Sequence, residues 1–163
     1  MKKFISVIFI LFSAFCAFAQ SAEMMDQIIE ADKVTYGQIS YLSAVHQKLV
    51  GDEATEEEAL NALLNVKHLS KSVLPETVIT LEDLSCLYLK MWPSVKGGFM
   101  CRITNKAPRY AYKQLQEDGI LPKNSDPWNT VSGFEALNIL TKCMMTYVPE
   151  EERMTLNDDG MED

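Results

Sequence analysis

The chain has 163 residues, of which 47% are hydrophobic, and its 23 Asp and Glu against 15 Lys and Arg give a net charge of −8. This length is enough for one domain with a real hydrophobic core. The acidic balance argues against general nucleic-acid binding, because that binding relies on Lys and Arg to neutralise phosphates.

The first 19 residues predict a secretory signal peptide. Lys2 and Lys3 precede an apolar run, and Ala17–Ala19 has the small-x-small pattern of a cleavage site. The apolar run of about 15 residues is short for a bilayer span, and no second run follows it. Lipidation of Cys16 is the less favoured alternative, since the bulky Phe15 precedes that cysteine. We therefore expect export to the periplasm or cell envelope, or secretion, with no transmembrane segment after cleavage.

The first half of the remaining chain predicts three helices. Apolar residues at i, i+4 spacing predict a lead-in helix within residues 20–33. The capping-box pattern T-x-x-Q at Thr35 predicts a helix that ends near Gly51, and T-x-x-E at Thr55 predicts another that continues toward Ser72.

The second half predicts three more helix starts. T-x-x-D at Thr80 begins a helix that should end at Trp92, before a proline. Pro108 suits a first helical turn, and Gly119 suits the left-handed position that ends a helix. S-x-x-E at Ser132 is a further capping box and predicts the last helix.

Two segments lack this helical pattern. The alternating residues Phe99, Cys101 and Ile103 predict a short strand or an extended segment after a Gly-Gly loop. Residues 150–163 carry seven acidic side chains against one arginine, which predicts a disordered acidic tail.

Four helix starts share a hydroxyl residue followed three positions later by Gln, Glu or Asp. One capping box is common in unrelated helices, but four in one short chain indicate a reused unit. We therefore predict an all-α domain over residues 20–149, in which helix-loop-helix repeats pack as a small bundle of about five helices.

Several stretches resemble divergent S-layer homology repeats of bacterial envelope proteins, including short exported proteins of spirochaete type. VTYGQISYL (Val34–Leu42) and VITLEDLSCL (Val78–Leu87) are similar to the opening helix of that repeat. RYAYKQLQEDGIL (Arg109–Leu121) is similar to its second, aromatic-rich helix, and DPWNTVSGFEALNIL (Asp126–Leu140) to its proline turn and next helix. The resemblance implies a helical, pseudo-threefold, non-catalytic fold that anchors exported proteins to cell-wall polymers.

The resemblance has one departure that concerns binding. In the family, the arginine of a T-R-A-E motif often contacts the anionic polymer. The matching positions of this chain are Tyr36, Leu81 and Gly133, and none of them is basic.

A positively charged segment lies between Asp83 and Glu117, where the sequence has no acidic residue. Cations interleaved with aromatic rings suit an anionic glycan, peptidoglycan or the acidic face of a partner protein. The alternative is that the rings belong to the core and the cations only solvate the surface, which is more common for aromatic residues at helical spacing. The candidate ligand-binding residues are Trp92, Lys96, Arg102, Lys106, Arg109, Tyr110 and Tyr112.

Three cysteines follow the signal peptide, and the sequence leaves their state open. Cys86 and Cys101 are a possible disulfide pair, while buried reduced thiols are an equal alternative for these two and for Cys143. His46 and His68 are the only histidines, and neither belongs to a zinc or nucleophile motif. We predict no metal site, no cofactor and no enzymatic activity.

The sequence thus favours a non-catalytic exported protein that binds or anchors to cell-wall polymer or peptidoglycan. The alternative is a periplasmic interaction partner, or an accessory subunit of an envelope complex, that uses an apolar groove between helices. The sequence specifies no oligomeric state.

Overall fold

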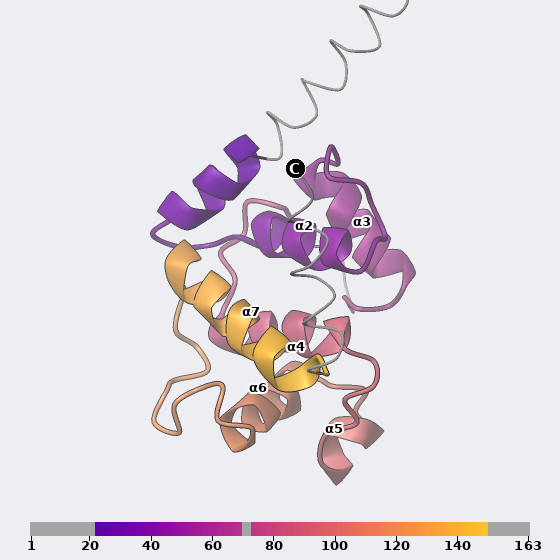
Figure 1. Ribbon diagram of the computed structural model, residues 1–163, viewed down its shortest axis with the longest axis vertical. Coiled ribbons are helices and arrows are strands. Elements are labelled where there is room, and N and C mark those ends of the chain that lie inside the picture. The colour runs from indigo at the N-terminus through magenta and orange to yellow at the C-terminus, as the bar shows by residue number, and fades with distance from the viewer. Residues whose placement is uncertain (1–21, 70–72, 150–163) are drawn as a thin grey trace, which may run out of the picture. The chain divides into compact units, whose positions relative to one another are not determined.

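The computed structural model describes residues 22–69 and 73–149, and this part of the chain is mostly helical, which confirms the all-α prediction (Figure 1). A helix at residues 22–30 is followed by six labelled helices. They are α2 (Tyr36–His46), α3 (Glu56–Asn65), α4 (Leu81–Met91), α5 (Phe99–Ile103), α6 (Pro108–Glu117) and α7 (Gly133–Tyr147). The expected signal peptide and acidic tail lie outside the described residues.

The described part of the chain divides into two compact units. Of the described residues, the first unit comprises 22–69, 73–79 and Ser132–Phe134, and the second comprises Thr80–Val131 and residues 135–149. Within the first unit α2 packs against α3, and within the second unit α6 packs against both α4 and α5 (Figure 1).

The helix starts of the first unit follow the predicted capping boxes. The Gln38 N–H donates to Thr35 Oγ1 (3.3 Å), and the Thr35 N–H donates to Gln38 Oε1 (3.1 Å). Thr55 and Glu58 make the same reciprocal pair at the start of α3, with distances of 3.2 and 2.8 Å. Each pair satisfies N–H groups that have no partner inside the helix.

Both helices of the first unit end earlier than predicted. Helix α2 ends at His46 and α3 at Asn65, rather than near Gly51 and Ser72. The reason is a left-handed residue shortly after each helix, Lys48 with φ 55° and Lys67 with φ 60°. Lysine rarely adopts this conformation, so neither helix end could be recognised from its residue type.

The helices α4 and α6 of the second unit begin and end close to the predicted positions. Helix α4 begins after Thr80, whose Oγ1 accepts from the Asp83 N–H (3.3 Å), and α6 has Pro108 in its first turn. Gly119 has φ 76° just after α6, as a left-handed helix stop requires.

Helices α2 and α4 start with the same kind of backbone contacts. In the first unit the Tyr36 and Gly37 N–H groups donate to Thr77 O and Pro75 O, both at 2.8 Å. In the second unit the Leu81 and Glu82 N–H groups donate to Asn129 O (2.9 Å) and Pro127 O (3.0 Å). In each unit, therefore, a later segment that contains a proline satisfies free N–H groups at the start of a helix, which is α2 in the first unit and α4 in the second.

Helices α3 and α6 also end alike. The His68 and Leu69 N–H groups donate to Leu63 O after α3 (2.8 and 3.4 Å), and the Ile120 and Leu121 N–H groups donate to Leu115 O after α6 (2.9 and 3.0 Å). Lys67 and Gly119 occupy equivalent left-handed positions just before these residues. The pairs α2–α3 and α4–α6 therefore share one local design.

The segment around Cys101 corrects a prediction. We expected a strand or extended chain over Phe99–Ile103, whereas these residues form the short helix α5. The apolar residues at every second position do not mark a strand here. Cys101 is buried at the middle of a single helical turn, while Phe99 and Ile103 lie on the exposed side of that turn. Within residues 22–69 and 73–149 there is no β-strand with which an extended segment could pair.

Candidate functional site

Part of the predicted positive segment forms a groove between α5 and α6. It encloses about 300 Å³ and lies entirely in the second unit. Its lining residues come from the start of α5 and from one face of α6: Gly98, Phe99, Met100, Cys101, Tyr110, Lys113, Gln114 and Glu117.

Helix periodicity explains which residues of α6 reach the groove. Tyr110, Lys113, Gln114 and Glu117 follow one another at i, i+3, i+4 and i+7, so they share one face of the helix. The opposite face is buried and carries Ala111, Tyr112 and Leu115. Two of the candidate aromatic residues, Tyr110 and Tyr112, are therefore separated by the geometry of α6.

A glutamine fixes the entry to α5. Gln114 Oε1 accepts a hydrogen bond from the Gly98 N–H (2.7 Å), which ties the loop before α5 to the side of α6. Gly97, one residue earlier, has φ 63°, and a Cβ there would lie 3.0 Å from Cys101 Sγ. Gln114 is absent from the predicted site, although its i+4 spacing from Tyr110 is a usable signal.

Helix α5 presents apolar side chains to solvent. The exposed fractions are 74% for Phe99, 45% for Met100 and 64% for Ile103, whereas Cys101 is buried. Three exposed apolar residues on one short helix form a patch, whereas isolated ones are normal on any surface.

Four cations of the predicted segment are exposed, and one of them, Lys113, lines the groove. Lys96 precedes α5, Arg102 belongs to it, and Arg109 and Lys113 are on α6. The structure thus supports surface positions for Lys96, Arg102 and Arg109 from the predicted set. Tyr110 is half-buried and lines the groove, and Lys113 joins it as a residue that the predicted site omitted.

Lys106 has a structural role in place of the expected ligand contact. Its Nζ donates to Trp92 O (2.8 Å) and Leu89 O (3.0 Å), two carbonyls at the end of α4. A cation at a helix C-terminus also interacts favourably with the helix dipole. Burial is the main cause of the lowered pKa of this ammonium group.

Phe99, which the alternative interpretation placed in the core, is exposed. Trp92, which that interpretation also placed there, is a core residue, and so is Tyr112. Each is only 6% exposed. The Trp92 ring lies against Tyr147, with ring centroids 5.6 Å apart. The Tyr112 hydroxyl hydrogen-bonds the carbonyl oxygen and the hydroxyl of Ser125 at 2.5 and 2.8 Å. Neither side chain is available to a ligand at the surface.

Cys86, Cys101 and Cys143 are buried free thiols, so the suggested Cys86–Cys101 disulfide is not present in the structure. The Cys86 thiol donates to Lys106 O (3.1 Å), and the Lys106 N–H donates to Cys101 O (2.7 Å). Burial raises the thiol pKa of Cys86 and Cys101, and it raises that of Cys143 to about 12.

The positions that match the T-R-A-E arginine cannot all serve a ligand. Leu81 is buried, and a Cβ added to Gly133 would lie 1.6 Å from Ile28 O. Any side chain at position 133 would collide with the backbone of the helix at residues 22–30, so an arginine has no room there.

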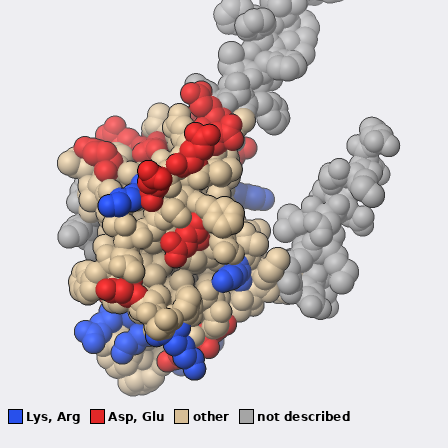
Figure 2. Space-filling model, turned by 90° about the vertical axis from the view of Figure 1, so that its left-hand side faces the viewer, with Lys and Arg blue, Asp and Glu red and all other residues tan. Residues whose placement is uncertain are grey.

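The two units differ in charge. The described residues of the first unit include ten Asp and Glu against three Lys, while those of the second unit include six Asp and Glu against eight Lys and Arg. Figure 2 shows Asp and Glu crowded on one part of the visible face and Lys and Arg gathered on another. Although the whole chain has a net charge of −8, the described part of the second unit has more basic than acidic residues and can attract anions.

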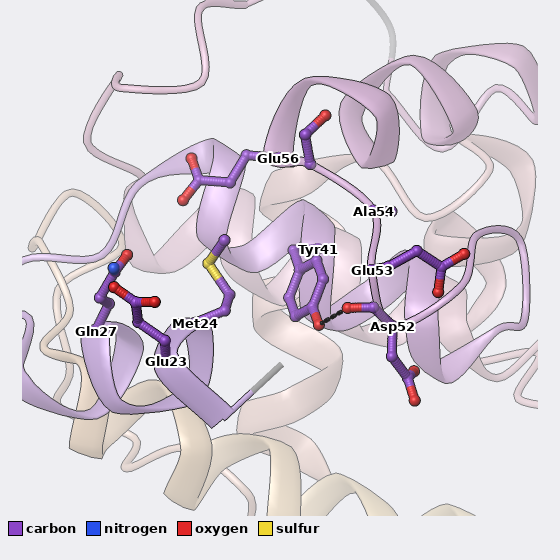
Figure 3. Close-up of a pocket in the computed structure, with 9 residues that line it drawn as sticks. Glu23, Met24, Gln27, Tyr41, Asp52, Glu53, Ala54 and Glu56 are labelled. Atoms are coloured by element: carbon purple, nitrogen blue, oxygen red, sulfur yellow. Dashed lines mark hydrogen bonds between the residues drawn. The ribbon is translucent and has the colours of Figure 1, made fainter. Parts of the chain in front are cut away.

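A second cavity, of about 290 Å³, lies in the first unit (Figure 3). Tyr41 stands at its centre and donates from its hydroxyl to Asp52 O (2.8 Å). Four carboxylates line it, but they do not converge, because Glu53 points away from Tyr41 and Glu23 stands across the cavity beside Gln27. Burial raises the pKa of Glu56, whose carboxylate packs over Gly37. This arrangement gives no focused binding point.

No protein-family model, curated protein or solved structure matches the chain. Among residues 22–69 and 73–149 there is no group of three or more His, Cys, Asp or Glu side chains that could hold a metal ion. No helix in that part of the chain combines the length and the hydropathy needed to cross a bilayer.

Proposed function

We propose that the protein is an exported, non-catalytic binding protein of the bacterial cell envelope, and that its second unit binds an anionic cell-wall polymer. The observation that carries the proposal is a groove lined by Tyr110 and Lys113, in a segment that also carries the exposed cations Lys96, Arg102 and Arg109. Cations supply attraction to phosphate or carboxylate groups, and a tyrosine ring offers a face for a sugar.

The repeated contacts support the scaffold part of this proposal. The pairs α2–α3 and α4–α6 share helix-start donors and helix-end acceptors, as expected for S-layer homology-like helix-loop-helix repeats. Helix α7 also begins after Ser132, and the Gly133 N–H donates to Ala31 O (2.8 Å), which continues the pattern of helix starts held by another segment. The proposed polymer site lies beside α6, and the lining of its groove includes none of the T-R-A-E positions.

Co-sedimentation with purified sacculi tests the proposal. We expect the protein to pellet with sacculi that carry wall polymer and to pellet less after the anionic polymer has been stripped. The variant Arg102→Ser/Arg109→Ser should lose most of the binding, because each position contributes an exposed charge. The control Lys33→Ser/Lys142→Ser removes two exposed charges from other helices or loops and should bind like the unmodified protein.

Two results would contradict this function. One is failure of the unmodified protein to pellet with sacculi at low salt. The other is equal loss in both double variants, which would indicate general charge attraction without a site. Retention on a defined envelope protein in the absence of polymer would favour the accessory-subunit alternative.

A further inference from the structure

The apolar patch on α5 is not explained by polymer binding. Phe99, Met100 and Ile103 are all exposed, and they make up three of the five residues of the helix. Met100 and Ile103 offer nothing to a charged sugar polymer, and exposing them to water is unfavourable. The patch therefore calls for an apolar partner.

The charges around the patch narrow the chemistry of that partner. Arg102 lies within α5, Lys96 lies just before it, and both are exposed. The chain has no acidic residue from position 84 to position 116, so α5 is flanked on both sides by sequence that carries only positive charges. The partner must combine an apolar interior with an anionic surface.

A bilayer that contains anionic lipid has this combination at its interface. Short apolar elements enter the boundary between headgroups and acyl chains, and nearby Lys and Arg are attracted to lipid phosphates. The buried Cys101 holds α5 against the rest of the unit, so that its other side chains face outward. A protein partner would need a larger contact area than one turn of helix provides.

We propose that α5 docks on the surface of an anionic lipid bilayer. Phe99, Met100 and Ile103 enter the interface, and Lys96 and Arg102 contact lipid phosphate groups. The proposal shares its cations with the polymer site and rests on the proposed function only for export to the envelope. It requires no membrane-spanning segment.

Vesicle co-sedimentation of the full protein tests this proposal. The probes are vesicles of phosphatidylcholine alone and of phosphatidylcholine with phosphatidylglycerol. We expect binding only to the vesicles with phosphatidylglycerol, and weaker binding as salt is added, because salt screens the charges. Phe99→Ser/Ile103→Ser should weaken that binding by more than about tenfold, because two apolar side chains can no longer enter the interface.

The control is matched in exposure. Phe134 and Met145 on α7 are 73% and 62% exposed, close to the 74% and 64% of Phe99 and Ile103. Phe134→Ser/Met145→Ser should therefore leave vesicle binding unchanged. Circular dichroism should show the same helix content in both variants, since all four side chains are exposed.

The outcomes separate this proposal from polymer binding. Loss of vesicle binding by Phe99→Ser/Ile103→Ser, with vesicle binding retained by Phe134→Ser/Met145→Ser, supports membrane docking. Binding of the unmodified protein to sacculi but not to the anionic vesicles overturns membrane docking alone. Binding to vesicles but not to sacculi upholds membrane docking and overturns the polymer function. Equal vesicle binding by the Phe99→Ser/Ile103→Ser variant and its control also overturns membrane docking.

Discussion

The carbonyl oxygen of Ile28 lies 1.6 Å from the point where a Cβ would stand on Gly133. The nearby Gly133 N–H donates to Ala31 O (2.8 Å), so the start of α7 and the end of the helix at residues 22–30 are in direct backbone contact. A backbone oxygen cannot swing aside as a flexible side chain can. Glycine is therefore required at this position for space.

Gly133→Ala should destabilise the protein by about 3 kcal/mol, because the two backbones must separate. The sign of the change is diagnostic, since Gly to Ala in an ordinary helix is stabilising. Urea unfolding followed by circular dichroism measures it. Gly98→Ala is the control, because its Cβ would meet only Gln114 Oε1 at 3.7 Å. Similar unfolding midpoints for the two variants would contradict the contact.

Lys106→Met should lower the free energy of unfolding by about 1 to 2 kcal/mol, because the carbonyls of Leu89 and Trp92 lose their charged donor. Lys113→Met, at an exposed position of α6, should change stability by less than about 0.5 kcal/mol. Thermal unfolding of the two variants makes the comparison. If Lys106→Met instead abolished sacculus binding at full stability, Lys106 would be a ligand contact as first predicted.

Tyr112→Phe should cost about 1 to 2 kcal/mol of stability and leave sacculus binding unchanged. The reason is that the hydroxyl bonds Ser125 and accepts from Gln116 Nε2 (2.9 Å), contacts that close the loop after α6. Tyr110→Phe keeps the ring in the groove and loses no hydrogen bond of this kind, so it serves as the stability control. Weaker polymer binding by a folded Tyr112→Phe variant would indicate that Tyr112 belongs to the polymer-binding site.

Alkaline pH should destabilise the second unit. Burial raises the pKa of the Cys143 thiol from 9.0 to about 12, and burial also raises the pKa of Tyr88 and Tyr147. Between pH 9 and 12 the folded state thus holds protons that the unfolded state releases, so stability falls as pH rises through this window. For Cys143 alone the loss approaches about 4 kcal/mol.

Urea unfolding at pH 8, 9 and 10 tests this dependence. Cys143→Ala removes one of the groups, so its stability should fall less steeply with pH than that of the unmodified protein. The slopes of the unfolding free energy against pH are compared, and not its absolute values, because the substitution also changes packing. Identical slopes would show that the Cys143 thiol does not contribute.

Buried thiols should also react slowly with a thiol reagent. Cys86, Cys101 and Cys143 are each at most 6% exposed, and thiolates are disfavoured by their raised pKa values. We expect three fast-reacting thiols in denaturant and nearly none in the native chain that lacks residues 1–19. A protein purified without reductant that shows only one thiol in denaturant would establish the disulfide that the structure lacks.

Much of the helical framework was predictable because its signals are local. Thr35, Thr55 and Thr80 cap their helices through residues three positions away, and Pro108 and Gly119 mark the two ends of α6. Lys67 occupies the position equivalent to Gly119, yet nothing in a lysine indicates a left-handed conformation. The end of α3 was therefore placed too late.

The site was predicted only in part, because tertiary contacts decide which cations are exposed. Lys96, Arg102 and Lys106 look equivalent in the sequence, and only the fold directs Lys106 onto the end of α4. Periodicity alone could have separated Tyr110 from Tyr112, since residues two apart point to different sides of a helix. The helix α5 was missed because its single turn has the same spacing as a short strand.

The hydrogen bonds that start α2 and α4 run from backbone N–H groups to backbone carbonyls of Pro75, Thr77, Pro127 and Asn129. Every amino acid has such a carbonyl, so these contacts place almost no demand on side-chain identity. The segments PET and PWN perform the same task while sharing only their proline. A fold held in this way can keep its architecture while its sequence drifts far from that of any relative.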